Sequence, residues 1–168
     1  MALPTLWKGV NLFVDGLNQY GIVADVTPPK ITYKTDDWQG GGLVAPVKVE
    51  QGLEALEASF SLGGFSAEVM AQMGGSINGK TVRVQGALQR DDRDEYVELV
   101  AEMRGRITEA DAGTAKQADN GEHKFTMPLT YYRLVVDGKE VIEIDILGGK
   151  CVINGKDQYA NMRKALGV

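Results

Sequence analysis

The stretch from Thr126 to Leu147, TMPLTYYRLVVDGKEVIEIDIL, constrains the fold more than any other part of the chain. Two runs rich in β-branched and aromatic residues flank Asp137-Gly138, a dipeptide that accepts the positive φ angles of a two-residue turn. The sequence therefore predicts one long β-hairpin. With that turn, the expected cross-strand pairs on one face are Tyr131 with Ile144, Leu129 with Ile146 and Arg133 with Ile142. Such a ribbon is marginal alone, so the rest of the chain must cover it.

Most of the remaining chain also reads as strand, turn, strand. Alternating apolar and polar residues predict strands, among them 54–62, 81–90 and 95–108, and the last two form a second long hairpin. A short helix is expected at 67–73 after a Ser66 cap, and a C-terminal helix at about 157–166. We expect a single domain over residues 1–168, mainly β: an antiparallel sandwich or barrel with long hairpins and one or two short flanking α-helices.

A segment at about 35–52, TDDWQGGGLVAPVKVEQG, stands apart from these strands. Its three consecutive glycines and its proline predict a long loop without regular structure, yet its apolar side chains are unusual for a solvated linker. The loop either folds back on its own domain or docks on another subunit, and we favour the second interpretation. The candidate inter-subunit residues are Trp38, Gly40, Gly41, Gly42, Leu43, Val44 and Val47.

Charge and cysteine content exclude several classes of protein. The formal net charge is −5 with a pI of about 4.9, which argues against a surface that grips phosphates, although nucleic acid could still slide past such a surface. Cys151 is the only cysteine, so no internal disulfide is possible and a small buried residue is expected. We expect neither a signal peptide nor a membrane-spanning segment, because no apolar run is long enough.

The sequence contains no set of residues that is typical of a catalytic site. Residues 74–81, GGSINGKT, match the phosphate-binding pattern GxxxxGK[ST], but an apolar helix is expected before the glycines and a strand after them, the reverse of the order that phosphate binding needs. His123 is the only histidine and is expected to be solvated, so a multi-histidine metal site is excluded. We predict no enzymatic activity, no cofactor and no metal.

Several segments in order resemble one protein family over nearly the whole chain. They include NLFVDG at 11–16, the glycine-rich segment ending at Gly42, the run APVKVEQGLEALEASFSLGG ending at Gly64, MRGRITEAD at 103–111 and TYYRLVVDGKEVIEID at 130–145. Together these resemble the major tail tube proteins of contractile-tailed bacteriophages and the related tube proteins of R-type tailocins. The resemblance implies hexameric rings stacked into a hollow tail tube, with strands of all subunits joined around the lumen.

The resemblance also implies partners and surfaces. A tube protein would contact itself, the tail sheath, the baseplate, the tail terminator and, in the lumen, the tape-measure protein and passing DNA, within a virion assembled in the host bacterial cytoplasm. Polar strand faces supply the lumen-facing candidates Glu57, Ser59, Ser61, Glu98 and Glu102. Charged residues near them supply the ring-contact candidates Arg104, Arg106, Glu143 and Asp145.

Two alternatives stay open on the sequence alone. One is the tube of a tailocin or of a type VI-like injection machine, which stacks in the same way but conducts no genome. The other is a monomeric β-sandwich binding module, which would need a concave aromatic surface. The two tryptophans of the chain, Trp7 and Trp38, both lie in segments expected to be irregular.

Overall fold

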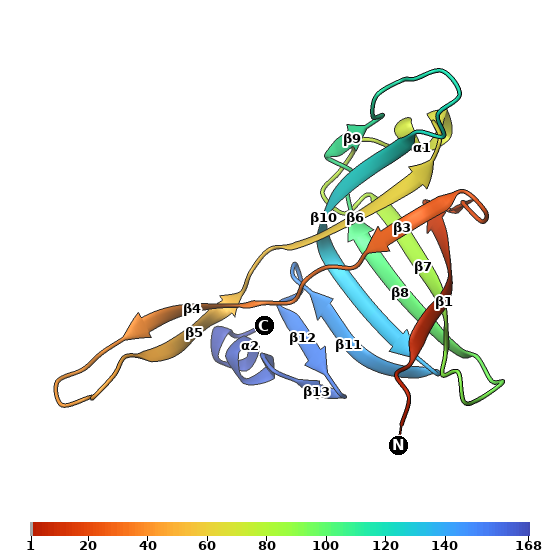
Figure 1. Cartoon of the computed structure of the whole chain (residues 1–168). Helices are drawn as coiled ribbons and strands as arrows, with labels where there is room; N and C mark the ends of the chain where they lie inside the picture. Colours follow the sequence, from red (N-terminus) through yellow and green to blue (C-terminus); the bar gives the residue numbers. More distant parts are fainter. Residues whose placement is uncertain (1) are drawn as a thin grey trace.

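The computed structural model describes residues 2–168 and is mostly antiparallel β-sheet with two short helices, as the sequence predicts (Figure 1). The elements follow one another as β1 (Leu6–Val14), β2 (Leu17–Asn18), β3 (Val23–Thr27), β4 (Tyr33–Trp38), β5 (Val47–Leu53), β6 (Leu56–Gly63), α1 (Ala67–Met70), β7 (Lys80–Gln89), β8 (Val97–Gly105), β9 (Glu109–Asp111), β10 (Glu122–Val136), β11 (Lys139–Asp145), β12 (Lys150–Ile153), β13 (Lys156–Asp157) and α2 (Ala160–Leu166).

The strand β10 organises the body because it belongs to two layers. Its second half pairs with β8 and β11 in a sheet of order β13-β12-β11-β10-β8-β7-β1-β2. Its first half pairs with β6 and β9, and β3 pairs with the other edge of β6. The register against β8 shifts between Leu129 and Tyr131, where β10 passes from one layer to the other. Gly105 lies at this crossing. A larger residue would not fit there, because a Cβ would sit 2.0 Å from the Pro128 carbonyl oxygen.

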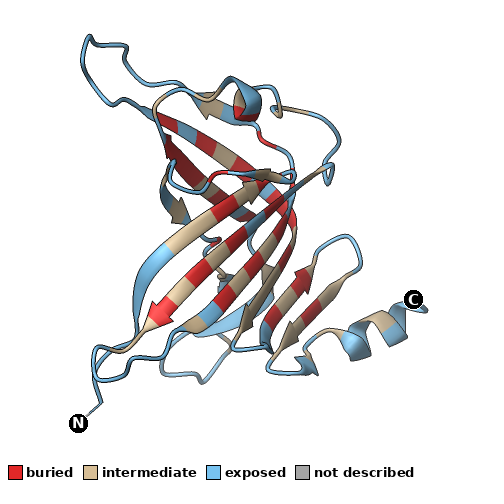
Figure 2. Cartoon of the chain, turned by 90° about the vertical axis from the view of Figure 1, so that its right-hand side faces the viewer, coloured by how far each residue is buried: buried red, intermediate tan, exposed pale blue. Residues whose placement is uncertain are grey.

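The core fills the space between the two layers. Inward residues alternate with outward ones along β6, β7, β8 and β10, which gives the stripes of buried and exposed residues in Figure 2. Phe60 of β6 and Phe125 of β10 stack at its centre with ring centroids 5.0 Å apart. Cys151 of β12 is buried, as the sequence predicts. On β7, Gly86 leaves room for the Trp7 ring, since a Cβ would lie 2.8 Å from it.

The register of the central hairpin differs from the prediction by one residue. The turn forms at Asp137-Gly138, with φ of 52° and 73°, and Val136 pairs with Lys139. A bulge then leaves Val141 unpaired within the ladder, so that Tyr131 pairs with Asp145 and Tyr132 pairs with Ile144. The predicted pairs of Tyr131 with Ile144, Leu129 with Ile146 and Arg133 with Ile142 are therefore wrong. The bulge lets Tyr132 enter the core and keeps the Arg133 charge on the outside.

The predicted irregular loop at 35–52 is also wrong in its conformation. β4 and β5 form a regular hairpin that projects from the body, here called the arm (Figure 1). Asp37 pairs with Lys48 in the ladder, and their side chains lie 3.0 Å apart. The glycines break regular structure only at residues 39–46, here called the tip, because both flanking runs hold residues that pair across the ribbon.

Both helices are shorter than expected. α1 keeps its predicted cap, because the Ser66 hydroxyl accepts a hydrogen bond from the Val69 amide at 3.4 Å. α2 starts after β13 rather than at Asp157, whose carboxylate instead accepts from the Tyr159 amide and contacts Arg163. Gly167 ends α2 with a φ of 78°, as a helix C-terminus requires.

Candidate assembly surfaces

The outward face of β7, β8, β10 and β11, here called the charged face, presents a ladder of alternating charges. Paired positions place Arg83, Glu102, Arg133 and Glu143 side by side across the four strands. Arg133 lies 3.9 Å from Glu102 and 3.9 Å from Glu140. Exposed pairs at such distances contribute little to stability, but they neutralise one another across the sheet. This face is therefore polar and nearly neutral along its centre.

Two carboxyl groups on this face lie close together because of the β11 bulge, which puts both Glu140 and Glu143 on the outside. A hydrogen bond between the two raises the pKa of Glu140 and lowers the pKa of Glu143. Lys150 of the neighbouring strand β12 also favours the charged form of Glu143, and their side chains are 3.2 Å apart. Glu143 is thus the carboxyl group of the pair whose charged form its neighbours favour.

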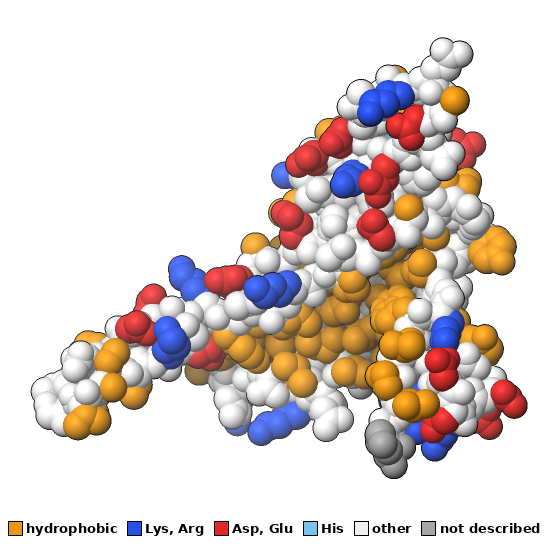
Figure 3. Space-filling model, viewed as in Figure 1, with side chains coloured by type: hydrophobic (Ala, Val, Ile, Leu, Met, Phe, Trp, Pro, Cys, Tyr) orange, Lys and Arg blue, Asp and Glu red, His pale blue; other side chains and the backbone are white. Residues whose placement is uncertain are grey.

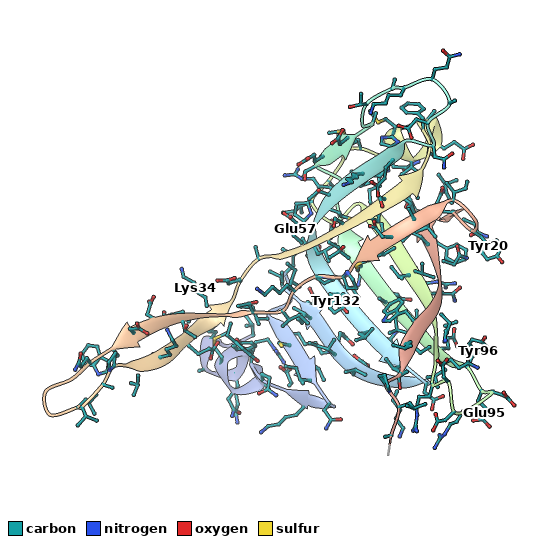
Figure 4. All side chains as sticks on the ribbon, in the orientation of Figure 1. Tyr20, Lys34, Glu57, Glu95, Tyr96 and Tyr132 are labelled. Carbon is teal, nitrogen blue, oxygen red and sulfur yellow. The ribbon has the colours of Figure 1, made fainter. Side chains whose placement is uncertain are left out.

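The five lumen-facing candidates do not share one face. Glu98 and Glu102 lie on β8 and belong to the charged face, whereas Glu57 and Ser59 lie on β6 in the other layer, and Figure 4 places Glu57 on the outside of that layer. The two layers share one core, so their outward faces point away from each other. Ser61 is only 2% exposed and therefore does not present its side chain on an open polar face.

The ring-contact candidates are held partly by their own chain. Arg104 stacks over the Tyr131 ring at 4.0 Å, and Asp145 accepts a hydrogen bond from the Gly148 amide at 3.0 Å. Glu143 pairs with Lys150 as described above. Arg106 lies exposed between β8 and β9. Three of the four residues therefore order the charged face, and Arg106 is the exposed one, next to the buried Ile107.

The arm carries several exposed apolar side chains. Trp38, Leu43, Val44 and Val47 are all exposed, and Val44 is fully so. Figure 3 shows apolar side chains both at the end of the arm and around its root. Isolated apolar side chains on a surface need no explanation, but a projecting group of them marks a contact site.

The root of the arm is fastened to the C-terminal segment. The Glu50 carboxylate accepts hydrogen bonds from the Gly52 amide and from the Tyr159 hydroxyl, both at 2.8 Å. Burial, followed by the Glu50 carboxylate, raises the pKa of Tyr159 to about 12. Hydrogen bonding to Arg163 and to the Tyr159 amide lowers the pKa of Asp157 to about 2. These contacts fix the direction in which the arm leaves the body.

His123 is buried, and the prediction of a solvated histidine is wrong. Its ring lies between Phe65 and Phe125, and its Nδ1 accepts from the Ser66 amide at 3.4 Å. Burial lowers the pKa of His123, against a weaker opposing effect of Asp111. The alternation of β10 carries the signal that the sequence reading missed, because His123, Phe125 and Met127 occupy successive inward positions.

The phosphate-binding pattern has no phosphate-binding geometry. The strand β7 begins at Lys80, whose ammonium group contacts Gln72 at 2.8 Å and Asp15 at 3.6 Å. No helix N-terminus therefore follows the glycines. Throughout residues 2–168, no three His, Cys, Asp or Glu side chains gather closely enough to hold a metal ion. The part of the chain that the structure describes has no helix with the length and apolarity to cross a membrane.

Comparison with known proteins identifies the family. The model of the family "Phage tail tube protein FII" matches residues 4–167. The chain belongs to the phage tail tube family. Family membership places it among structural components of contractile tails and virions rather than among enzymes.

Two relatives show how fully the chain matches this family. The tail tube protein of Escherichia phage P2 is 36% identical over 172 residues, with all of both chains covered. The major tail tube protein of Serratia phage KSP20 is 41% identical over 161 residues, which cover 95% of this chain and 93% of the relative. The family assignment therefore applies to the arm and the C-terminal segment as well as to the body.

Solved structures show the same fold at low sequence identity. The sheath/tube terminator of an extracellular contractile injection system, PVC, superposes with a TM-score of 0.56 at 13% identity, covering 79% of this chain and 96% of that one. A chain of the PVC sheath-tube complex superposes with a TM-score of 0.53 at 14% identity, covering 76% of this chain and 86% of that one. At this identity the likeness concerns the fold alone.

Proposed function

We propose that this tail tube family member assembles into hexameric rings, which stack into the inner tube of a contractile phage tail and conduct DNA during ejection. The whole chain, 1–168, acts as one tube domain with the arm as its inter-subunit segment. The observation that carries this proposal is the arm, because its exposed apolar residues have no cover within their own chain. A contact with another copy would bury them.

The edges of the sheet support lateral assembly. β1 pairs with β2 only at Phe13 and Val14, so its outer edge from Leu6 to Leu12 has no strand beside it in the described chain. An open edge invites pairing with another chain, and ring closure is one way to remove it. The long strands of the charged face would then continue from subunit to subunit around a lumen.

We assign the charged face to the lumen wall, with Glu98 and Glu102 as lumen residues. Glu57, Ser59 and Ser61 would then lie on the side away from the lumen. Arg106, exposed between β8 and β9, remains a ring-contact candidate, whereas Arg104, Glu143 and Asp145 would order the wall. A ring of six chains at −5 each would carry −30, six times −5. Within such an acidic ring, a wall that is nearly neutral along its centre would hold phosphates weakly, so DNA can pass without specific binding.

The partners follow from the same assembly. The outer surface of the tube would contact the tail sheath, its ends would contact the baseplate and the tail terminator, and its lumen would hold the tape-measure protein before DNA passes. Assembly would take place in the host bacterial cytoplasm. The two curated relatives are both phage proteins, which favours the genome-conducting tube over a tailocin or type VI-like tube.

Electron microscopy of the purified chain tests the assembly. We expect stacked rings with a central channel in negative stain, either at high concentration or after addition of preformed tube ends that nucleate growth. A chain that stays monomeric in the presence of such ends would refute the proposal and favour a monomeric binding module.

A charge-reversal pair tests the lumen wall. Tubes of the Glu98→Lys, Glu102→Lys double variant are expected to retain short duplex DNA at low salt, and this retention should weaken as salt is raised. The control Glu57→Lys, Lys124→Glu keeps its charge changes on the other layer and should retain none. Equal retention by both variants would contradict the assignment of the charged face.

A further inference from the structure

An apolar groove opens beside the root of the arm. β6 begins at Leu56, which pairs with Leu129 of β10, and the residues just before it turn away into the arm. The space between this departing segment, the end of β11, β12 and α2 forms a groove of about 450 Å³. Its apolar walls include Leu53, Leu56, Leu129, Ile144, Leu147 and Met162.

Two of the charged groups that line the groove are held by their own chain. The Asp145 carboxylate accepts a hydrogen bond from the Gly148 amide at 3.0 Å, and Lys150 contacts Glu143 at 3.2 Å. Leu147 and Met162, by contrast, are more than half or half exposed, at 62% and 50%. The opening therefore offers a mostly apolar surface that is still in contact with water, with Glu54, Asp145 and Lys150 among its lining residues.

The tip of the arm has the matching chemistry. Residues 39–46, QGGGLVAP, contain no charged side chain. Leu43 and Val44 are exposed, and a Cβ at Gly41 or Gly42 would meet no heavy atom within 4 Å, so the tip is thin and unobstructed. An uncharged, narrow tip can pack against the apolar walls of the groove without bringing in a charge that would need a partner.

A chain cannot place its tip in its own groove. Gly52, Leu53 and Glu54 form one wall of the groove and are also the root of the arm. From Leu53 to Val47 the strand β5 leads away over about 20 Å at the usual rise per residue. The contacts of Glu50 with Gly52 and Tyr159 hold this root in place. The occupant must come from another molecule.

We infer that the groove receives the tip of the arm of a second copy of this chain. The inference rests on the proposed function, because it names the receiving surface for the arm in the assembly. Tip and groove are different surfaces, so the contact is heterologous: each copy inserts one arm and receives one. Such a contact repeats from copy to copy, and two copies alone cannot satisfy it.

Photo-crosslinking tests where the tip goes. Val44 is replaced by p-benzoylphenylalanine in the full chain, a position whose full exposure makes the replacement harmless to the fold. Tubes grown from a mixture of ¹⁴N and ¹⁵N chains are irradiated, and mixed-isotope adducts are located by mass spectrometry. We expect adducts with residues 144–149 or 159–162 of another copy. Tubes whose adducts map elsewhere overturn the groove and leave the proposed function standing.

A matched pair of substitutions tests the groove itself. Leu147→Asp places a carboxylate in the groove wall, and Leu166→Asp places one at a residue of similar exposure, 70%, that does not line the groove. We expect at least a tenfold rise in the concentration needed for tube growth with Leu147→Asp alone, while circular dichroism shows both variants folded. Equal growth of the two variants overturns the inference. Failure of the unsubstituted chain to grow on preformed tube ends overturns this inference and the proposed function together.

Discussion

Replacing Phe125 with alanine removes the middle ring of an aromatic row in the layer that β6 and the first half of β10 form. Phe125 is fully buried and stands between Phe60, at 5.0 Å, and His123, at 4.2 Å, and His123 in turn stacks on Phe65. The change leaves a cavity at the centre of this row and removes two ring contacts. Phe→Ala changes in protein cores cost about 3–5 kcal/mol. For a chain of this size, that corresponds to a fall in Tm of about 6–20 °C.

Phe65→Ala is the matched control, because it removes an identical side chain from the end of the same row. Phe65 is 67% exposed and contacts only one ring, His123. Its loss should cost about 0.5–1.5 kcal/mol, the value of one aromatic contact. The two variants thus differ in burial and not in chemistry.

Urea unfolding followed by circular dichroism measures both costs. The chain must be kept at concentrations where light scattering shows monomers only, since association would add to the apparent stability. The slope of unfolding free energy against urea should stay constant, so that the midpoint alone reports the change. A loss for Phe125→Ala no larger than that for Phe65→Ala would refute the view that the buried ring of this row stabilises the body.

Three further predictions concern single contacts. Gly105→Ala should prevent folding into the native sheet, seen as loss of the cooperative thermal transition, because its Cβ would lie 2.0 Å from the Pro128 carbonyl oxygen; a native-like transition would contradict the close approach. Because burial lowers the pKa of His123 on folding, the unfolded chain binds the proton first, so stability should fall as pH drops through the ordinary value of 6.5 until the folded pKa is passed; His123→Phe should flatten this dependence, and an unchanged slope would count against it. Tyr159→Phe removes the hydroxyl that donates to Glu50 and should cost about 0.5–1 kcal/mol in urea unfolding while hydrogen exchange speeds up in the arm root; exchange that stays as slow as in the unsubstituted chain would show that this bond does not hold the arm.

Alternation and turn chemistry made the strands predictable from the sequence. The strands 81–90 and 95–108 and the turn at Asp137-Gly138 correspond to β7, β8 and the β10–β11 turn. These features depend only on residues that are close in the sequence, and at these positions the local strand or turn preference matches the burial in the fold. The fold class followed because the same pattern recurs along most of the chain.

The position of a bulge and burial by residues distant in the sequence cannot be predicted from local alternation. The bulge at Val141 shifts the register by one, and nothing in the local alternation marks it, because Val141 is itself a good strand residue. The burial of His123 depends on Phe65, which is 58 residues away in the sequence. The sequence predicts a loop where the arm forms, because the glycines of the tip are a stronger local signal than the pairing residues on both sides.

The candidate surfaces were predicted less well than the fold. Strand alternation gives two faces for each strand but does not say which strands share a layer, so Glu57 and Glu98 were grouped although they lie on opposite layers. The apolar residues of the arm were found from composition alone. The groove cannot be predicted from composition, because its walls come from segments that are distant in the sequence and meet only in the fold.

The position of β10 late in the chain has a consequence for synthesis. β6 and β8 both need β10 as a partner, yet β10 spans residues 122–136 of a chain of 168. At about 5–20 residues per second the ribosome releases the arm several seconds before β10 is available to close the body. Until then the groove has no Leu129 wall and the arm root has no Tyr159 to hold it. A nascent chain therefore exposes the apolar tip of the arm before it has formed the Leu129 wall of the groove or the Tyr159 contact of the arm root.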